Sequence, residues 1–375
     1  MGHLPSQSSY RSDPEKGKTM TQLAKVFELN RQGLNIARGV AIAVVLLLPL
    51  VVLGLIHQDQ YWLSVSFGAM FVGLSDPGGE YADRVPPMAL TGVAGALLTA
   101  LGFGVGGQAW GFVVLAAFVV TLLGGLAVKF GVHRFAQATL LNVWFIIAIT
   151  LPDAYRADHI HPNAWAQALA WLIGSALWIA FTCIVWLARG RTAEPSPVPE
   201  IPGDTSPVKL TRPIILFALI RAIALAGAVA IAFGLHLPNA DWMPLATIVA
   251  MKPSLQQSML VGEQRVAGTI IGAAVATLFL LTVHNKYALE VVIVVLAAVA
   301  GSIRGVNYAW YCAASAGAVL IALDLPHPSN LADEGRRVLF TFVGVAIAIV
   351  VLLLAGLLQK RTAKAAPQTP QASTA

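Results

Sequence analysis

The feature that most constrains this chain is a series of apolar runs, several of them 18 residues or longer. A run of that length crosses a bilayer as an α-helix, and lipid leaves no other open structure with its backbone groups satisfied. The composition agrees, since 57% of the residues are hydrophobic and only 11% are charged, against about a quarter charged in soluble domains. Alternating strand patterns are absent, which argues against a membrane β-barrel. The sequence therefore predicts an all-α polytopic membrane protein.

The apolar runs fall into two sets of six, so we expect about twelve transmembrane helices. The first set covers 36–56, 60–75, 85–105, 109–130, 136–151 and 164–188, and the second covers 213–235, 241–251, 257–283, 287–302, 306–324 and 335–358. The predicted segments are a cytoplasmic N-terminal segment (1–33), a first six-helix repeat (34–188), a Pro-rich cytoplasmic linker (189–212), a second six-helix repeat (213–358) and a disordered C-terminal tail (359–375).

The two sets resemble each other in order. The corresponding residues are Arg38 with Arg221, Trp62 with Trp242, Pro77 with Pro253, and Arg84-Val85 with Arg265-Val266. Six helices per set give both halves the same orientation, so we expect a parallel internal repeat.

The basic residues predict the orientation. With Arg38, Arg84, Arg221, Lys252 and Arg265 set aside as candidate intramembrane residues, 15 of the remaining 19 Lys and Arg lie on the side of the N-terminus. Cytoplasmic loops carry the excess of Lys and Arg, so both termini are expected in the cytoplasm. This topology also accounts for the net charge of +6 without a nucleic-acid partner.

Two of the apolar runs are interrupted by Pro77 and Pro253 before they can cross the membrane. Trp62 to Pro77 spans about 22 Å as a helix and Trp242 to Pro253 about 16 Å, against a hydrocarbon core of about 30 Å. Paired interrupted helices at matching places in two halves indicate a transport site. The alternative is that each break is an ordinary cytoplasmic turn with its charges in water.

The residues near these breaks form the predicted pathway. Its cationic candidates are Arg38, Arg84, Arg221, Lys252 and Arg265, which would favour anions. For Arg38 and Arg221 the alternative is snorkelling to the headgroups.

Acidic and aromatic side chains complete the predicted site. Glu263, Asp76 and Asp83 are candidate proton carriers. Tyr308 and Tyr311 could stack on a flat ring or donate to a carboxylate, whereas Trp62, Trp242 and Trp310 read better as an interfacial belt.

Other patterns carry structure rather than chemistry. Gly268 and Gly272 form a GxxxG face that lets helices approach closely. The acidic and imidazole side chains of one predicted external loop lack zinc-site spacing, so no metal is expected; they are Asp153, Asp158, His159 and His161. The chain has no phosphate-binding loop and no hydrolytic set, so we expect no cofactor and no enzymatic activity.

The stretch around Trp242, Pro253-Ser254, Arg265, Gly268 and Thr269 resembles the fusaric acid resistance and aromatic acid exporter superfamily. Plant aluminium-activated malate channels are distantly similar. The resemblance is good over 213–358 and weak over 36–188, where "RVPPMALTG" lacks the Arg-x-x-Gly-Thr form.

The resemblance implies a multi-pass permease of the bacterial inner membrane that exports small organic acids, often aromatic, with the proton gradient as driving force. A periplasmic adaptor and a homo-oligomer are partners that the resemblance leaves open. Two other functions also stay open, a passive organic-anion channel and a non-transporting membrane assembly component.

Overall fold

The computed structural model describes residues 26–77, 81–157, 163–191, 207, 209–239, 241–252, 255–324 and 331–365. Within these residues the chain is all-helical, with twelve α-helices and three short 3-10 helices and without strands. The α-helices of the first half are α2 (Ile36–Leu55), α3 (Trp62–Ser75), α4 (Tyr81–Val105), α5 (Trp110–Leu126), α6 (Val132–Ala157) and α7 (Ala164–Ala188). Those of the second half are α8 (Arg212–Gly234), α9 (Trp242–Ala250), α10 (Leu255–Thr282), α11 (Lys286–Ile303), α12 (Tyr308–Asp324) and α13 (Leu331–Ala365).

The twelve α-helices of the described residues coincide with the twelve apolar runs, which confirms the all-α prediction. Nine of them are long and apolar enough to cross a membrane. The other three, α3, α9 and α12, have 14, 9 and 17 residues. The helix lengths therefore do not support twelve full membrane spans. Helix α9, at about 14 Å, is far shorter than a bilayer core.

Asparagine side chains fix the starts of three helices. The Oδ1 atoms of Asn35, Asn163 and Asn285 accept hydrogen bonds from backbone N–H groups in the first turns of α2, α7 and α11. These N–H groups have no partner within the helix, and Asn is among the best residues at this position. Each Asn stands where a polar loop meets an apolar run.

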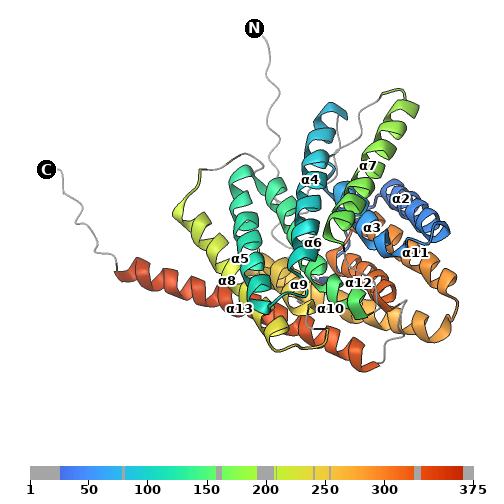
Figure 1. Cartoon of the computed structure of the whole chain (residues 1–375). Helices are drawn as coiled ribbons and strands as arrows, with labels where there is room; N and C mark the ends of the chain where they lie inside the picture. Colours follow the sequence, from blue (N-terminus) through green and yellow to red (C-terminus); the bar gives the residue numbers. More distant parts are fainter. Residues whose placement is uncertain are drawn as a thin grey trace, which may run out of the picture.

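Helix packing recurs between the halves. In the first half, α7 packs on α3 and α4, and α6 packs on α4 and α5; in the second half, α13 packs on α9 and α10, and α12 packs on α10 and α11. The halves meet through α5 against α8 and α2 against α11, which Figure 1 shows as two helix pairs at opposite sides of the molecule. The fourth helix of each half thus packs on the first helix of the other.

Glycine brings the last helix of each half close to its broken helix. A Cβ atom on Gly174 of α7 would lie 1.9 Å from the Val65 carbonyl oxygen of α3, and one on Gly344 of α13 would lie 2.2 Å from the Met243 carbonyl oxygen of α9. Neither site has room for any side chain. The Thr247 hydroxyl reinforces the second contact by donating to the Gly344 carbonyl at 3.0 Å.

Gly268 and Gly272 make a similar contact between α10 and α12. A Cβ at Gly268 would lie 2.4 Å from the Ala309 carbonyl oxygen, and one at Gly272 would lie 2.6 Å from that of Ala313. This approach sets α10 directly against the helix that carries Tyr308.

The aromatic core of the first half lies among α3, α4, α6 and α7. Trp144 and Trp171 are fully buried with ring centroids 4.7 Å apart. Their indole N–H groups donate to the Thr99 hydroxyl at 2.8 Å and to the Gly92 carbonyl at 3.0 Å. Because each buried N–H has a partner, this core contributes packing without a desolvation penalty.

Replacing Gly344 by Ala is expected to destabilise the protein by about 1–3 kcal/mol, as overpacking of a tight contact does, because α9 has to move away from α13. Gly356, on the same helix, has nothing within 4 Å of the position its Cβ would take. Gly356→Ala is therefore the control, and thermal unfolding in detergent is the measurement. Equal melting temperatures for the two variants would show that the contact does not matter.

Candidate functional site

The first broken helix, α3, ends at a buried ion pair. Asp76 follows the helix directly, and its Oδ1 and Oδ2 accept hydrogen bonds from Arg84 Nε at 2.9 Å and Arg84 Nη2 at 2.6 Å. The two side chains are only 9% and 4% exposed. Such a two-pronged Arg–carboxylate contact is strong and geometrically specific. Arg84 and Asp76, predicted as pathway residues, thus hold each other at the break.

Side chains from three other segments satisfy the last carbonyl groups of α3. Arg38 of α2 donates to the Gly73 carbonyl, Arg304 after α11 donates to that of Leu74 at 3.5 Å, and Gln137 of α6 donates to that of Ser75 at 3.2 Å. The final carbonyls of a helix have no partner within it, and they carry a partial negative charge that cations stabilise.

Arg221 does the same for the second broken helix, α9. Its Nη2 atom donates to the Ile248 carbonyl at 3.2 Å and to the Thr139 hydroxyl at 3.0 Å, and its guanidinium stands 4.9 Å from the centroid of the Phe135 ring. The side chain is fully buried. Arg38 and Arg221 lie in the first helix of each half, and each donates to a carbonyl of the broken helix in its own half. Pro253 and Ser254, which follow this break, lie outside the described residues.

A cavity of about 830 Å³ lies between the halves. The first half contributes α3 and α6 to its wall, and the second half contributes α9, α10, α12 and the turn after α11. The break after α9 opens onto this cavity through Lys252, whereas no residue of the break after α3, Asp76–Pro77, is among the lining residues.

The cavity wall carries more positive than negative charge. Its described cationic residues are Lys252, Arg265 and Arg304, and its described acidic residue is Glu28. Lys252 lies within electrostatic range of Arg265, and Tyr311 lies within range of both arginines. The three cations therefore share one region, where an anion would be stabilised by all of them.

Two tyrosines stand among these cations. The rings of Tyr308 and Tyr311 lie 5.7 Å apart, centroid to centroid, and the Arg304 guanidinium is 5.9 Å from the Tyr311 centroid. Arg265 lies within electrostatic range of Tyr308 and of Cys312. Hydroxyl groups held beside guanidinium groups can donate to a carboxylate together with them.

Another part of the cavity wall is apolar. It includes Phe67, Met70 and Phe71 of α3 with Trp242 and Leu245 of α9.

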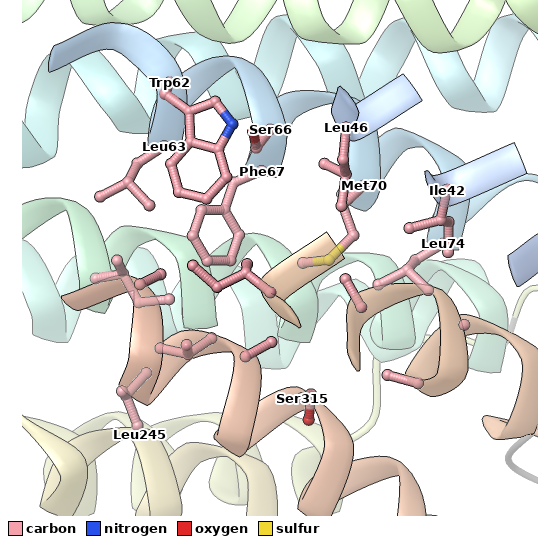
Figure 2. A pocket seen from close by; sticks show the side chains of 18 of the residues that line it. Ile42, Leu46, Trp62, Leu63, Ser66, Phe67, Met70, Leu74, Leu245 and Ser315 are labelled. Carbon is pink, nitrogen blue, oxygen red and sulfur yellow. The ribbon is translucent and has the colours of Figure 1, made fainter. Parts of the chain in front are cut away.

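A second cavity of about 120 Å³ continues from this wall, since it shares Phe67, Met70, Trp242, Leu245 and Tyr311 with the first. Figure 2 shows Phe67 and Met70 of α3 facing the helix that carries Ser315. The two cavities together offer a cationic region joined to an aromatic and aliphatic one.

The structure brings together some of the residues predicted from the sequence and separates others. Those that line the large cavity are Lys252, Arg265, Tyr308 and Tyr311; those that do not are Arg38, Arg84, Arg221, Asp76, Asp83 and Glu263. Asp83 is exposed. Trp242 is only 5% exposed and lines both cavities, so it is a wall residue and not part of an interfacial belt. Trp62 lines the second cavity, and Trp310 is 42% exposed, as a belt residue is.

Arg304 is the site residue that the sequence analysis missed. It was counted among the cytoplasmic loop charges, because it lies in the polar stretch between two apolar runs. The segment "RGVNYAWY" could have indicated that Arg304 belongs to the site, because this residue lies only four positions before Tyr308. The connection is too short to leave the membrane surface.

The predicted absence of a metal site rests on residues that the structure describes only in part. Asp153 pairs with Arg156 at 3.1 Å on the surface. Asp158, His159 and His161 lie outside the described residues.

Breaking the buried pair with Asp76→Asn is expected to lower the free energy of unfolding by about 3–5 kcal/mol, because the Arg84 charge stays buried without its counter-charge. Asp153→Asn is the matched control, since its ion pair is 46% and 59% exposed and such pairs contribute about 0–1 kcal/mol. Substituting Asp76→Leu together with Arg84→Leu should recover much of the loss. Denaturant unfolding in detergent measures all three, and an equally mild effect of Asp76→Asn and Asp153→Asn would contradict the structural role.

Comparison with known proteins adds a family to this geometry. Residues 225–351 match the family model described as fusaric acid resistance protein-like. No curated protein and no solved structure matches the chain significantly, and the distant similarity to plant aluminium-activated malate channels stays a prediction. The matched stretch runs from within α8 to within α13 and includes Lys252, Arg265, Arg304, Tyr308 and Tyr311. Through this stretch, the chain is similar to the fusaric acid resistance protein-like family.

Proposed function

We propose that this multi-pass membrane protein is a secondary transporter that exports small organic acids, most of them aromatic carboxylates, across a bacterial inner membrane. The observation that carries the proposal is the 830 Å³ cavity between the halves, with its cationic region beside an apolar wall. The volume falls within the ~300–1,000 Å³ usual for small-molecule sites. Ionisable groups inside a membrane protein are costly and usually mark a substrate path.

The cations of the cavity suit a carboxylate. Arg265 and Arg304 present planar guanidinium forks, which bind carboxylates through two parallel hydrogen bonds, and Lys252 adds a point charge. The hydroxyl groups of Tyr308 and Tyr311 add donors within the same region. The carboxylate would therefore sit among α10, α12 and the turn after α11.

The apolar wall suits the rest of an aromatic acid. Phe67, Phe71 and Trp242 offer ring faces and edges, against which aromatic rings pack favourably. A short dicarboxylate would leave this surface without a partner and would bring a second charge next to it. The cavity therefore supports an aromatic monocarboxylate over an aliphatic dicarboxylate.

The arrangement of the halves supports a parallel repeat, with segments 34–188 and 213–358 as its units. The same helix pairs pack within each half. Between the halves, α5 packs on α8 and α11 packs on α2, so the fourth helix of each half contacts the first helix of the other. With an excess of Lys and Arg on the N-terminal side, we place both termini and the linker in the cytoplasm. The substrate path then runs between two similar bundles, as in other repeat transporters.

The acidic residues predicted as proton carriers do not line the cavities. Glu263, Asp76 and Asp83 line neither cavity, whereas Glu28 lines the large one and Asp241 the second. If the transporter is proton-coupled, Glu28 and Asp241 are therefore better placed to carry the proton. A passive organic-anion channel is the second candidate function, because the cationic cavity alone would suffice for it. A non-transporting assembly component is the third, and it needs no substrate at all.

Uptake into inverted membrane vesicles tests these functions directly, because inversion turns export into accumulation. We expect labelled 4-hydroxybenzoate to accumulate when a proton gradient is imposed, and labelled malate to accumulate much less. Equilibration of the label without regard to the proton gradient would favour the channel. Absence of any movement beyond that of protein-free vesicles would contradict transport of these acids and favour the assembly component.

The variants Arg265→Gln and Lys252→Gln are expected to reduce the initial rate of 4-hydroxybenzoate uptake at least tenfold at low substrate concentration. A hydrogen bond to a charged group contributes about 1.5–3 kcal/mol, and each removes one from the bound carboxylate. Arg156→Gln and Lys129→Gln are the controls, since both residues are exposed and neither lines the cavity. With insertion checked by surface labelling, wild-type rates in the cavity variants would refute this mechanism.

A further inference from the structure

Residues 26–35, which we name the strap, precede α2 and run against the turn between α11 and α12. Val26 is buried and Phe27 packs on Trp310 with ring centroids 5.8 Å apart. The Asn30 N–H donates to the Val306 carbonyl at 2.8 Å, and the Asn35 N–H donates to that of Ser302 at 2.9 Å. The strap is thus seated on the second half although it begins the first.

Two amide side chains hold the far end of the strap. Asn307 Nδ2 donates to the carbonyls of Val26 at 2.9 Å and Glu28 at 3.0 Å. Gln264 Nε2 donates to the Val26 carbonyl at 3.2 Å. Residues 27–30 of the strap lie outside helix and strand, so such bonds satisfy backbone groups that a loop would otherwise leave to water.

The strap also forms part of the cavity wall. Glu28, Leu29 and Asn30 line the large cavity together with Arg304 and Asn307. All three are also exposed residues. The strap therefore lies where the cavity wall includes exposed residues.

The two amide side chains that donate to the strap carbonyls are each next to a residue that lines the large cavity. Gln264 precedes Arg265 on α10, and Asn307 precedes Tyr308 at the start of α12. Asn307 Oδ1 also accepts hydrogen bonds from the N–H groups of Ala309 and Trp310 at 2.8 and 3.1 Å, and so caps α12. A shift of α10 or α12 around a bound anion would therefore move the donors that hold the strap.

We propose that the strap is a gate, which closes the large cavity at the face of the N-terminal segment and opens by releasing the carbonyls of Val26 and Glu28 from Gln264 and Asn307. The part that must be released, Val26 to Glu28, is held by three side-chain hydrogen bonds, one aromatic contact and the burial of Val26, so its release is local. Segments held this way open locally while the rest of the fold stays intact. The inference rests on the proposed function only in that the cavity is a path.

Cys312 provides a reporter of gate opening that needs no substrate. Its side chain lines the large cavity and is 3% exposed. With Cys183 replaced by Ala, it is the remaining cysteine of the chain. The probe is a sulfonate-bearing methanethiosulfonate reagent, whose negative charge suits the cationic region. It is applied to the purified protein in lipid nanodiscs, and the labelling rate of Cys312 is measured by mass spectrometry.

Gln264→Ala is expected to raise the labelling rate about fivefold, the population change that follows the loss of one ordinary hydrogen bond from a local opening equilibrium. Gln167→Ala is the matched control, because Gln167 also donates from its amide to a backbone carbonyl, that of Gln60 at 3.0 Å, away from the strap. An unchanged rate in Gln264→Ala, or an equal rise in Gln167→Ala, would overturn the gate.

A cross-link tests the same gate in the opposite direction. Val26→Cys with Gln264→Cys, in a chain with Cys183→Ala and Cys312→Ser, is oxidised to a disulfide and then reduced. Locking should lower uptake into inverted vesicles at least tenfold and reduction should restore it, whereas undiminished uptake with the disulfide in place would overturn the gate. If the labelling result holds but wild-type vesicles take up neither acid, the gate stands and the proposed substrate fails.

Discussion

A helix that stops inside a membrane protein leaves its last carbonyl groups without partners, and lipid offers none. The structure meets this constraint twice with an arginine from the first helix of the same half. Arg38 donates to the Gly73 carbonyl of α3, and Arg221 donates to the Ile248 carbonyl of α9. These bonds let α3 and α9 end early, and both helices line the cavity between the halves.

The charged residues at the two helix breaks differ between the halves. At the first break, Arg84 and Asp76 form a buried ion pair in which their charges neutralise each other. At the second break, Lys252 and Arg265 line the cavity instead. The halves are thus similar in packing and unequal in chemistry, with the first half serving as scaffold and apolar wall. Arg304 connects the two roles, since it binds the Leu74 carbonyl and also lines the cavity.

The helices were predictable from the sequence because hydrophobicity and length alone decide which runs can lie in lipid. Lys252, Arg265, Tyr308 and Tyr311 were predicted as pathway residues, and all four line the large cavity. Arg38 and Arg221 were assigned to the pathway, and their capping role depends on which carbonyls neighbouring helices bring within reach. Arg304 was missed for a related reason, because its contact with the Leu74 carbonyl depends on how the second half packs against α3.

The central claim is that the cavity recognises an organic anion by its charge. Isothermal titration of purified protein with 4-hydroxybenzoate and with its uncharged amide, 4-hydroxybenzamide, tests this most directly, because the two differ little in shape. The account predicts that the carboxylate binds at least tenfold more tightly, a difference of about 1.4 kcal/mol, and that Arg304→Gln removes most of this preference. Equal affinity for the acid and the amide in the wild-type protein would contradict it.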